Sequence, residues 1–393
     1  MRDETLPDLP YTPDFETWPV THRPVAARAQ GDAVRVIWAD GAESIHLARL
    51  LRENSPDAET IHPLSRELLI SPTAIPADLS VRSASVENGI LGVVFTDRPD
   101  TCRYHPGWLR GTAWLGQVPE PDRAAPVLWD ATMAEVPSFD GPTALADNTT
   151  FLAWLEALAR NGVARLRGLP ERDGLLLEIA GRIGTIRDSN FGRVFTLAIQ
   201  DDPTSNAYTS HALPPHTDLA SRECPPGLQF LHCRENTTTG GMGTYVDGYR
   251  VAEDIRTEDP DLFETLTTLD WTFGNRARDT DYRATGPVIA LDAEGAVREI
   301  RYTVWLRQPV VAPLNEQRRA YESLRAFAVR AEDPRYRMEV RYAAGDLFAF
   351  DNRRALHGRT GYDAAGGARF IEGVYSDRDE LWSRIRVLRR GTR

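Results

Sequence analysis

His216-Thr217-Asp218 is the stretch that decides the fold of this 393-residue chain, because it offers two metal ligands on one short segment. Residues i and i+2 of an extended backbone point the same way, so one strand or turn can carry both. His357 follows a strand-like run, Asp346-Leu-Phe-Ala-Phe350, and an Asp351-Asn352 turn, and can close the site from a second strand. Two imidazoles and one carboxylate leave three coordination positions open, which is the ligand set of non-haem Fe(II) oxygenases.

Arg369 adds a group that a metal site alone does not need. It opens a second strand-like run, and period-two alternation places Arg369, Ile371, Gly373 and Tyr375 on one face. A guanidinium binds a carboxylate through two parallel hydrogen bonds. An Fe(II) site beside a buried carboxylate receptor indicates 2-oxoglutarate as cosubstrate. The alternative is a set of satisfied polar groups in a β-rich core, since a His-x-Asp tripeptide by itself is a weak signal.

Composition excludes several function classes. A hydrophobic content of 41% and a charged content of 26% describe a globular protein with a full core, and the length predicts two domains. The net charge of −11 argues against a nucleic-acid-binding surface. No apolar run reaches the length of a membrane span, and the polar N-terminus lacks a signal-peptide core. Three widely separated cysteines fit reduced thiols, so we expect a cytoplasmic protein.

Periodicity divides the chain into a small β-rich N-terminal domain over 1–118, a Pro-rich linker over 119–143 and a larger domain over 144–393. Within the first domain we expect a loosely packed leader over residues 1–30. The patterns predict strands at 34–38, 92–95 and 163–166, and helices at 151–161, 175–183 and about 316–329. Short strands and turns are expected to dominate the rest of the chain from Gly227 onward.

A series of further motifs resembles one known family. In chain order they are Asn206-Ala-Tyr-Thr, His216-Thr-Asp218, Pro225-Pro-Gly-Leu-Gln-Phe-Leu-His-Cys233, Thr239-Gly-Gly241, Val246-Asp-Gly248, Phe350-Asp-Asn352, Leu356-His-Gly-Arg359 and Glu372-Gly-Val-Tyr375. Together they resemble the γ-butyrobetaine dioxygenases and their relatives in the taurine-dioxygenase-like superfamily. The resemblance covers nearly the whole chain and is strongest from about residue 205 to residue 385.

The resemblance implies a mainly β protein with flanking helices, in which a double-stranded β-helix (jelly-roll) forms the catalytic domain. It implies that His216, Asp218 and His357 hold Fe(II) and that Arg369 binds the distal carboxylate of 2-oxoglutarate. Members of the family convert 2-oxoglutarate and O2 to succinate and CO2 while they hydroxylate a C–H bond of a small molecule. A homodimer is also implied.

The N-terminal domain departs from the family pattern at its zinc site. Relatives bind a structural zinc through three cysteines that follow a Leu-Arg-Asp-Asn-like segment, and through a later histidine. In this chain Leu51-Arg-Glu-Asn54 is present, but the cysteine positions hold Ser55, Asp57 and Thr60. Hydroxyl groups are poor zinc ligands, and we interpret His62 and His105 as surface histidines. We therefore expect no zinc.

The substrate pocket is assigned by resemblance alone. Relatives that bind γ-butyrobetaine surround its trimethylammonium group with aromatic rings, whose faces attract cations. The corresponding residues are Phe191, Phe195, Tyr208 and Tyr375. The asparagines that hold the substrate carboxylate are replaced by Ser205 and Thr303, beside Asn206, and Trp305 alters the pocket volume. Ordinary aromatic packing is the competing interpretation, and for Phe195 it is the favoured one.

Three functions follow from these patterns. The leading hypothesis is an Fe(II)/2-oxoglutarate-dependent dioxygenase that hydroxylates γ-butyrobetaine or a related betaine. The alternative keeps the cofactor chemistry but uses it for hydroxylation, desaturation or cyclisation of an amino-acid-like metabolite in a biosynthetic pathway. A non-catalytic β-barrel binding protein is the remote alternative, and the intact ligand set argues against it.

Overall fold

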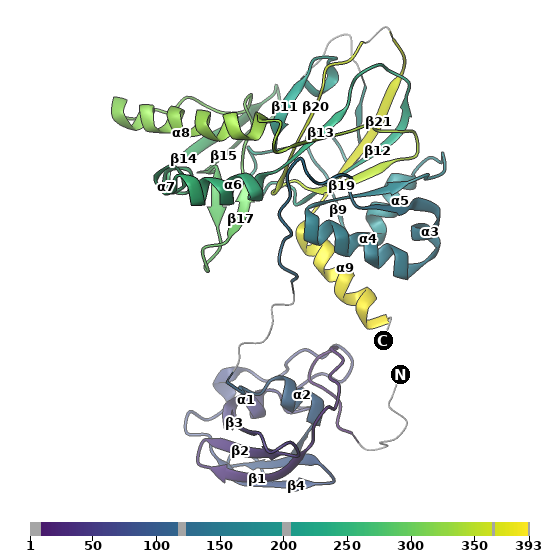
Figure 1. Cartoon of the computed structure of the whole chain (residues 1–393). Coiled ribbons are helices and arrows are strands. Elements are labelled where there is room, and N and C mark those ends of the chain that lie inside the picture. The colour runs from purple at the N-terminus through teal and green to yellow at the C-terminus, as the bar shows by residue number, and fades with distance from the viewer. Residues whose placement is uncertain (1–8, 117–122, 199–205, 364–365, 392–393) are drawn as a thin grey trace. The chain divides into compact units, whose positions relative to one another are not determined.

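The computed structural model describes residues 9–116, 123–198, 206–363 and 366–391. The chain divides into two compact units, Met1–Pro121 and Asp122–Arg393, which are described separately (Figure 1). Among the described residues no helix combines the length and the apolar character that a membrane crossing requires. The chain is mainly β with flanking helices, as the sequence predicts.

The N-terminal unit contains two antiparallel sheets of three strands each. Their orders are β1 (Pro24–Gln30), β2 (Ala33–Trp38) and β3 (Glu43–Leu47), and β4 (Val81–Glu87), β5 (Ile90–Phe95) and β6 (Thr101–Tyr104). The short helices are α1 (Ala48–Glu53), η1 (Pro72–Ala74) and α2 (Pro106–Gly111). Alternate residues such as Val34, Val36 and Trp38 are buried in the shared core, as period-two alternation predicts.

The expected leader over residues 1–30 is wrong for its last seven residues, which form β1. This strand pairs with β2 along Ala26 to Gln30, and Ala27 and Ala29 contact the core only partly buried. Small, half-buried residues carry little periodic signal, so the pairing partner and not the local sequence defines this strand.

The positions that carry cysteines in zinc-binding relatives form a hydrogen-bond network in this unit. Arg98 pairs with Asp57 at 3.0 Å, and the Thr60 hydroxyl donates to the same carboxylate at 3.1 Å. Arg52 reaches the Thr60 hydroxyl at 2.8 Å. The histidines also have structural partners, since the Nδ1 atom of His105 accepts from the backbone N–H of Trp108 at the start of α2. The loop is thus held by charged hydrogen bonds.

The second unit is built on two sheets that face each other. The large sheet has the order β10 (Phe195–Leu197), β21 (Arg369–Ser376), β12 (Leu228–Asn236), β19 (Leu347–Asp351), β8 (Val163–Arg167) and β7 (Ser138–Asp140), with β9 (Ile186–Arg187) paired to β21. The small sheet has the order β11 (Leu213–His216), β20 (Ala355–Arg359), β13 (Gly243–Asp247) and β18 (Arg337–Val340). This arrangement is the expected double-stranded β-helix.

Alternation along the strands separates an inner from an outer face. On β19, Leu347 and Ala349 face outward, whereas Phe348 and Phe350 belong to the cluster between the sheets. On β20, Leu356 faces the outer helices and His357 lines the inner cavity. Because both of its faces are covered, β19 is a nearly continuous apolar run.

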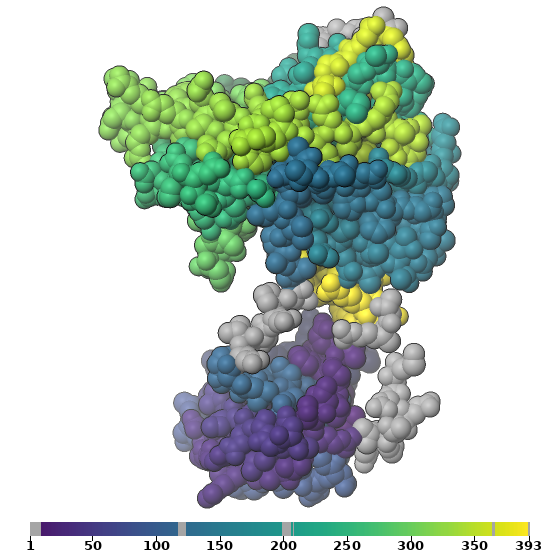
Figure 2. Space-filling model, in the orientation of Figure 1, coloured from purple at the N-terminus to yellow at the C-terminus, as the bar shows by residue number. Residues whose placement is uncertain are grey.

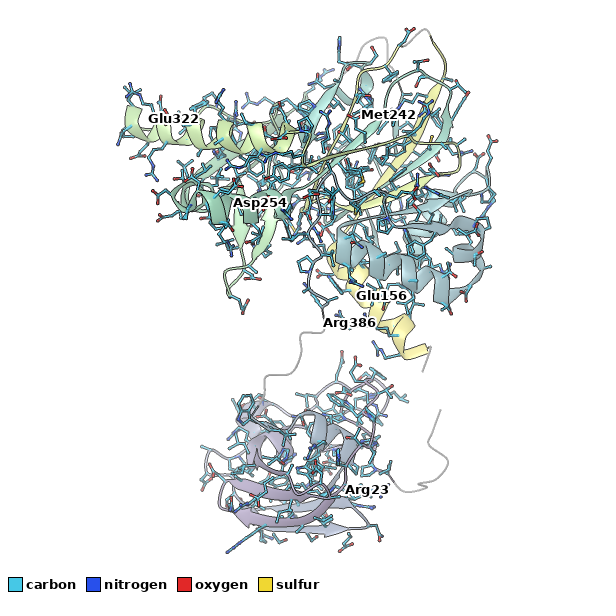
Figure 3. The ribbon with its side chains drawn as sticks, in the orientation of Figure 1. Arg23, Glu156, Met242, Asp254, Glu322 and Arg386 are labelled. Atoms are coloured by element: carbon cyan, nitrogen blue, oxygen red, sulfur yellow. The ribbon has the colours of Figure 1, made fainter. Side chains whose placement is uncertain are left out.

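Helices cover the outer face of the large sheet: α3 (Gly141–Ala146), α4 (Asn148–Asn161), α5 (Leu175–Ile183) and α9 (Arg378–Gly391) (Figure 1). Asp147 caps α4 by accepting from the Thr150 N–H, and Gly162 ends it at a positive φ of 70°. Figure 3 labels Glu156 on α4 and Arg386 on α9; Glu156 also pairs with Arg389 of α9 at 2.8 Å.

A second helical group packs against the small sheet: α6 (Gly248–Glu258), α7 (Pro260–Thr268) and α8 (Leu314–Glu332), with the hairpins β14 (Asp270–Arg276)–β15 (Asp281–Pro287) and β16 (Ile289–Leu291)–β17 (Val297–Ile300). This group forms the projection at one side of the unit in Figure 2. The helix expected around 316–329 is α8. The short strands and turns expected from Gly227 onward are present, but the helices α6, α7 and α9 among them were not predicted. Tertiary burial of apolar positions such as Val251 and Leu266 stabilises α6 and α7.

The linker expected over 119–143 lies largely within the second unit. Trp129 and Val136 are buried in the cluster between the sheets, and residues 138–140 form β7. The indole of Trp129 donates to the backbone carbonyl of Asn161 at 2.6 Å. The prolines of this segment interrupt helical and strand patterns, but they do not prevent an extended chain from packing.

Candidate metal centre and its cavity

The inner face of the double-stranded β-helix brings His216, Asp218 and His357 together. The register of the paired strands β11 and β20 places His216 directly opposite His357. Asp218 follows His216 by two residues. One ligand atom from each residue lies within 4.8 Å of the others. His216 Nε2 is 3.2 Å from Asp218 Oδ1, close to the separation of about 3 Å expected for neighbouring ligands with bonds of about 2.1 Å. Among the described residues this is the one such group of metal-ligating side chains.

Asn352 fixes the backbone of Asp218, the residue that supplies the ligand carboxylate. Its Oδ1 atom accepts from the Asp218 N–H at 2.7 Å, and its Nδ2 atom donates to the carbonyl oxygens of Asp218 at 3.0 Å and Pro226 at 3.1 Å. Asn352 is fully buried. The Tyr375 hydroxyl donates to Asp218 Oδ2 at 2.7 Å, a length typical of a charge-assisted hydrogen bond.

The charges of the three ligands favour a cation among them. Burial by itself would raise the pKa of Asp218, but His357 and His216 reverse this and hold the pKa well below its usual range. Burial, reinforced by the charge of His216, lowers the pKa of His357. A metal ion binds carboxylates that are ionised and imidazoles that are neutral, and these pKa shifts favour both forms.

The three ligands line a cavity of about 660 Å³. Its other lining residues come from both sheets, from the β14–β15 hairpin and from the segment around η2 (Asn206–Tyr208). Met242, labelled in Figure 3, precedes β13, the strand that carries the cavity residue Tyr245. A cavity of this size suits a small molecule together with a cosubstrate.

Arg369 and Arg359 give the cavity positive charge. Burial lowers the pKa of Arg369, and burial together with Arg369 lowers the pKa of Arg359 to about 10. The Nε and Nη1 atoms of Arg369 have no hydrogen-bond partner within the described part of the chain. Arg359 instead donates to the backbone carbonyls of Thr209 and His211 at 2.6 and 2.9 Å. Buried guanidinium nitrogens without a partner are the feature that an anionic ligand would satisfy.

Aromatic rings form another part of the wall. Phe195 stacks on Tyr375 with ring centroids 4.9 Å apart, and Phe191 and Tyr208 also line the cavity. Trp305 lies 4.5 Å from the ring of His216. Burial, followed by the charge of Asp218, raises the pKa of Tyr208, so this phenol stays neutral near the carboxylate.

The structure therefore brings most of the predicted site residues to one cavity. They are Phe191, Phe195, Asn206, Tyr208, His216, Asp218, His357, Arg369 and Tyr375. Thr303 is buried but does not line the cavity, and its hydroxyl has no partner among the described residues. Ser205 lies outside the described residues.

Several cavity residues were not predicted as site residues: Gln229, Tyr245, Asn275, Tyr342 and Arg359. Asn352, which contacts Asp218, was also missed. Gln229 and Asn352 both lie in motifs quoted above, Gln229 within an apolar strand and Asn352 in a turn. A single amide side chain in such a segment is the one feature of the sequence that could have marked them as site residues.

Comparison with known proteins agrees with this geometry. A model of the family described as taurine catabolism dioxygenase TauD, TfdA family matches residues 125–375. The chain belongs to this family. It is accordingly a dioxygenase. A second model, described as gamma-butyrobetaine hydroxylase-like, N-terminal, matches residues 25–110, which contain both sheets of the first unit except Pro24.

Two relatives are similar over almost their whole length. The gamma-butyrobetaine dioxygenase of Pseudomonas sp. (strain AK-1) is 40% identical over 380 residues, which is 96% of this chain and 99% of that enzyme. The gamma-butyrobetaine dioxygenase of Homo sapiens is 27% identical over 373 residues, 91% of this chain and 94% of that enzyme. Among solved structures, an asparagine oxygenase in complex with Fe(II), 2S,3S-3-hydroxyasparagine and succinate aligns with a TM-score of 0.48 and 18% identity, over 60% of this chain and 82% of that one.

Proposed function

We propose that this protein is an Fe(II)/2-oxoglutarate-dependent dioxygenase that hydroxylates γ-butyrobetaine or a closely related betaine. The observation that carries the proposal is the shared cavity. It contains the His–Asp–His ligand set, a wall of four aromatic rings, and a guanidinium whose Nε and Nη1 atoms have no partner among the described residues.

The residues present fit both cofactors. His216, Asp218 and His357 supply two imidazoles and a carboxylate, the donor set suited to Fe(II). Arg369 supplies the fork that would hold the distal carboxylate of 2-oxoglutarate. When bound, iron and 2-oxoglutarate supply the oxidising power for C–H hydroxylation. The chain's own contribution is to orient the substrate and to keep water from the buried site.

The aromatic wall supports a quaternary ammonium as the substrate headgroup. Phe191, Phe195, Tyr208 and Tyr375 present ring faces, which attract a methylated cation through their quadrupoles. A trimethylammonium group has no N–H donor and so needs no hydrogen-bond partner when it is buried. The two relatives named as gamma-butyrobetaine dioxygenases support the same substrate class.

The test compares γ-butyrobetaine with its unmethylated analogue, 4-aminobutyrate, by succinate formation from 2-oxoglutarate. We expect only γ-butyrobetaine to stimulate turnover in the wild type. Tyr208→Phe should keep the affinity, because a phenyl face retains the quadrupole, whereas Tyr208→Leu should lose about 0.5–2 kcal/mol of it. If neither compound stimulates succinate formation, the betaine assignment is wrong.

One observation favours a second candidate, the same chemistry on another amino-acid-like metabolite. Thr303, which stands where relatives hold the substrate carboxylate, does not line the cavity, and Trp305 occupies part of the wall near His216. A different carboxylate arrangement would follow from such changes. If γ-butyrobetaine does not stimulate succinate formation but an amino acid does, this second candidate is the correct one.

We further propose a cytoplasmic homodimer. The described cysteines, Cys102, Cys224 and Cys233, are all free thiols, as in a reducing compartment. The N-terminal unit exposes large apolar side chains such as Ile45 and Leu64, which a partner subunit would cover. Light scattering on the purified protein should give twice the chain mass of 43.9 kDa; the monomer mass would contradict the dimer.

A further inference from the structure

We propose that Tyr375 is a positioning residue for the metal carboxylate. Its hydroxyl holds one oxygen of Asp218, so that the other oxygen alone is presented to the metal. The inference rests on the proposed function, because it takes His216, Asp218 and His357 as metal ligands. It gives Tyr375 a task separate from the aromatic wall in which its ring takes part.

The two oxygens of Asp218 have different neighbours. Oδ2 accepts from the Tyr375 hydroxyl at 2.7 Å, and His357 Nε2 lies further from it, at 3.6 Å. Oδ1 lies 3.2 Å from His216 Nε2, a separation that suits two ligands on adjacent coordination positions. Oδ1 is therefore the oxygen that the geometry leaves to a metal.

The phenol is held rigidly in its place. Tyr375 lies on β21, between β12 and β9, with Gln229 and Arg187 as its register partners. Phe195 stacks on its ring, and the side chain is only 3% exposed. A ring packed in this way has no second rotamer available to it without displacing its neighbours.

Asn352 completes the restraint from the other side of the same residue. Because it bonds both the N–H and the carbonyl of Asp218, the backbone of this residue is fixed. The torsions of the Asp218 side chain are then the remaining freedom, and the hydrogen bond from Tyr375 restricts them. Asn352, in a turn, thus fixes the backbone of Asp218, and Tyr375, on β21, fixes its carboxylate.

This restraint matters for the number of open coordination positions. Two imidazoles and a carboxylate bound through one oxygen leave three positions of six open. A carboxylate bound through both oxygens would take one of these three. A cosubstrate that chelates through two atoms, together with O2, needs all three. The hydrogen bond from Tyr375 opposes the two-oxygen mode, since it keeps Oδ2 engaged with a proton donor.

The test replaces Tyr375 by Phe in the full chain and reads metal binding directly, with Co(II) as the probe in place of Fe(II). Loss of the hydrogen bond that orients a ligand carboxylate should weaken Co(II) binding roughly ten- to hundredfold. The visible absorption of the bound Co(II) should also change, because the carboxylate is free to bind through both oxygens. The KM for γ-butyrobetaine should stay within about threefold, since the phenyl ring preserves the aromatic face.

Tyr249→Phe is the matched control, because it removes a buried tyrosine hydroxyl that bonds the Arg298 carbonyl outside the cavity. We expect wild-type Co(II) affinity and spectrum for this variant. Wild-type affinity and spectrum in Tyr375→Phe, with a normal melting curve, would overturn the inference and leave the proposed function standing. Absence of Co(II) binding by the wild type would overturn the proposed function itself.

Discussion

Replacing Arg369 by Lys should act chiefly on the cosubstrate. In the structure Arg369 is half-buried at the start of β21 and lines the cavity, and its buried Nε and Nη1 atoms have no partner within the described residues. Nε and Nη1 belong to different edges of the guanidinium, and each edge also includes Nη2. Either edge therefore keeps at least one free donor, and a carboxylate that docks on it can accept two parallel hydrogen bonds. A lysine ammonium keeps the charge but cannot reproduce this pair of bonds.

The magnitude follows from the bond that is lost. One charge-assisted hydrogen bond contributes about 1.5–3 kcal/mol, and the buried position leaves little screening by solvent. The apparent affinity for 2-oxoglutarate should fall by roughly ten- to hundredfold. The turnover rate at saturating 2-oxoglutarate should fall much less, because Arg369 does not contact the triad in any described interaction.

The assay is succinate formation as a function of 2-oxoglutarate concentration, at a fixed saturating concentration of γ-butyrobetaine. Arg234→Lys is a suitable control: Arg234 lies on the neighbouring strand β12 and pairs with Glu372 at 3.1 Å and Asp173 at 2.9 Å instead of lining the cavity. We expect a wild-type KM for 2-oxoglutarate in this control. An unchanged KM in Arg369→Lys would refute the reasoning and would direct attention to Arg359 as the anchor.

Four further outcomes are expected. His357→Ala should bind no iron and form no succinate; iron analysis and turnover check this, and wild-type turnover would end the metal assignment. Asn352→Leu should weaken Co(II) binding and lower the melting temperature, since each buried polar group left unpaired at Asp218 costs about 1–3 kcal/mol. Metal analysis should find no stoichiometric zinc, because Arg98 already engages the carboxylate at the cysteine-equivalent position; one zinc per chain would contradict this. Burial lowers the pKa of His46 from 6.5 to about 4, so as pH falls through this range the unfolded chain takes up a proton that the folded chain does not. Acidification should then remove up to about 3 kcal/mol of stability, and His46→Gln should flatten this dependence in denaturant melts.

Much of the fold could be predicted where local pattern and burial agree. Helix α5 matches the predicted residues 175–183, and the strand predicted at 163–166 is β8 with one residue added, since both elements bury a regular apolar pattern. The strand β1 and the helices α6 and α7 could not be predicted. β1 and α7 bury few residues, and all three elements are stabilised by neighbours that are distant in sequence.

The same division applies to the site. Ligand chemistry needs residue types, and residue types are visible in the sequence: His216, Asp218, His357 and Arg369 could be selected without coordinates. The substrate positions depended on resemblance, and the cavity does not include Thr303.

The sequence by itself determined the class of chemistry, because a facial ligand set and a carboxylate receptor are specified by side-chain identity and alternation along strands. Only the tertiary structure decided how the ligand carboxylate is held. The hydrogen bonds that link Asn352 and Tyr375 with Asp218 join residues 134 and 157 positions apart. No local pattern encodes such contacts, since they exist only after the sheets have paired in register and brought a turn, a strand end and a third strand around one carboxylate.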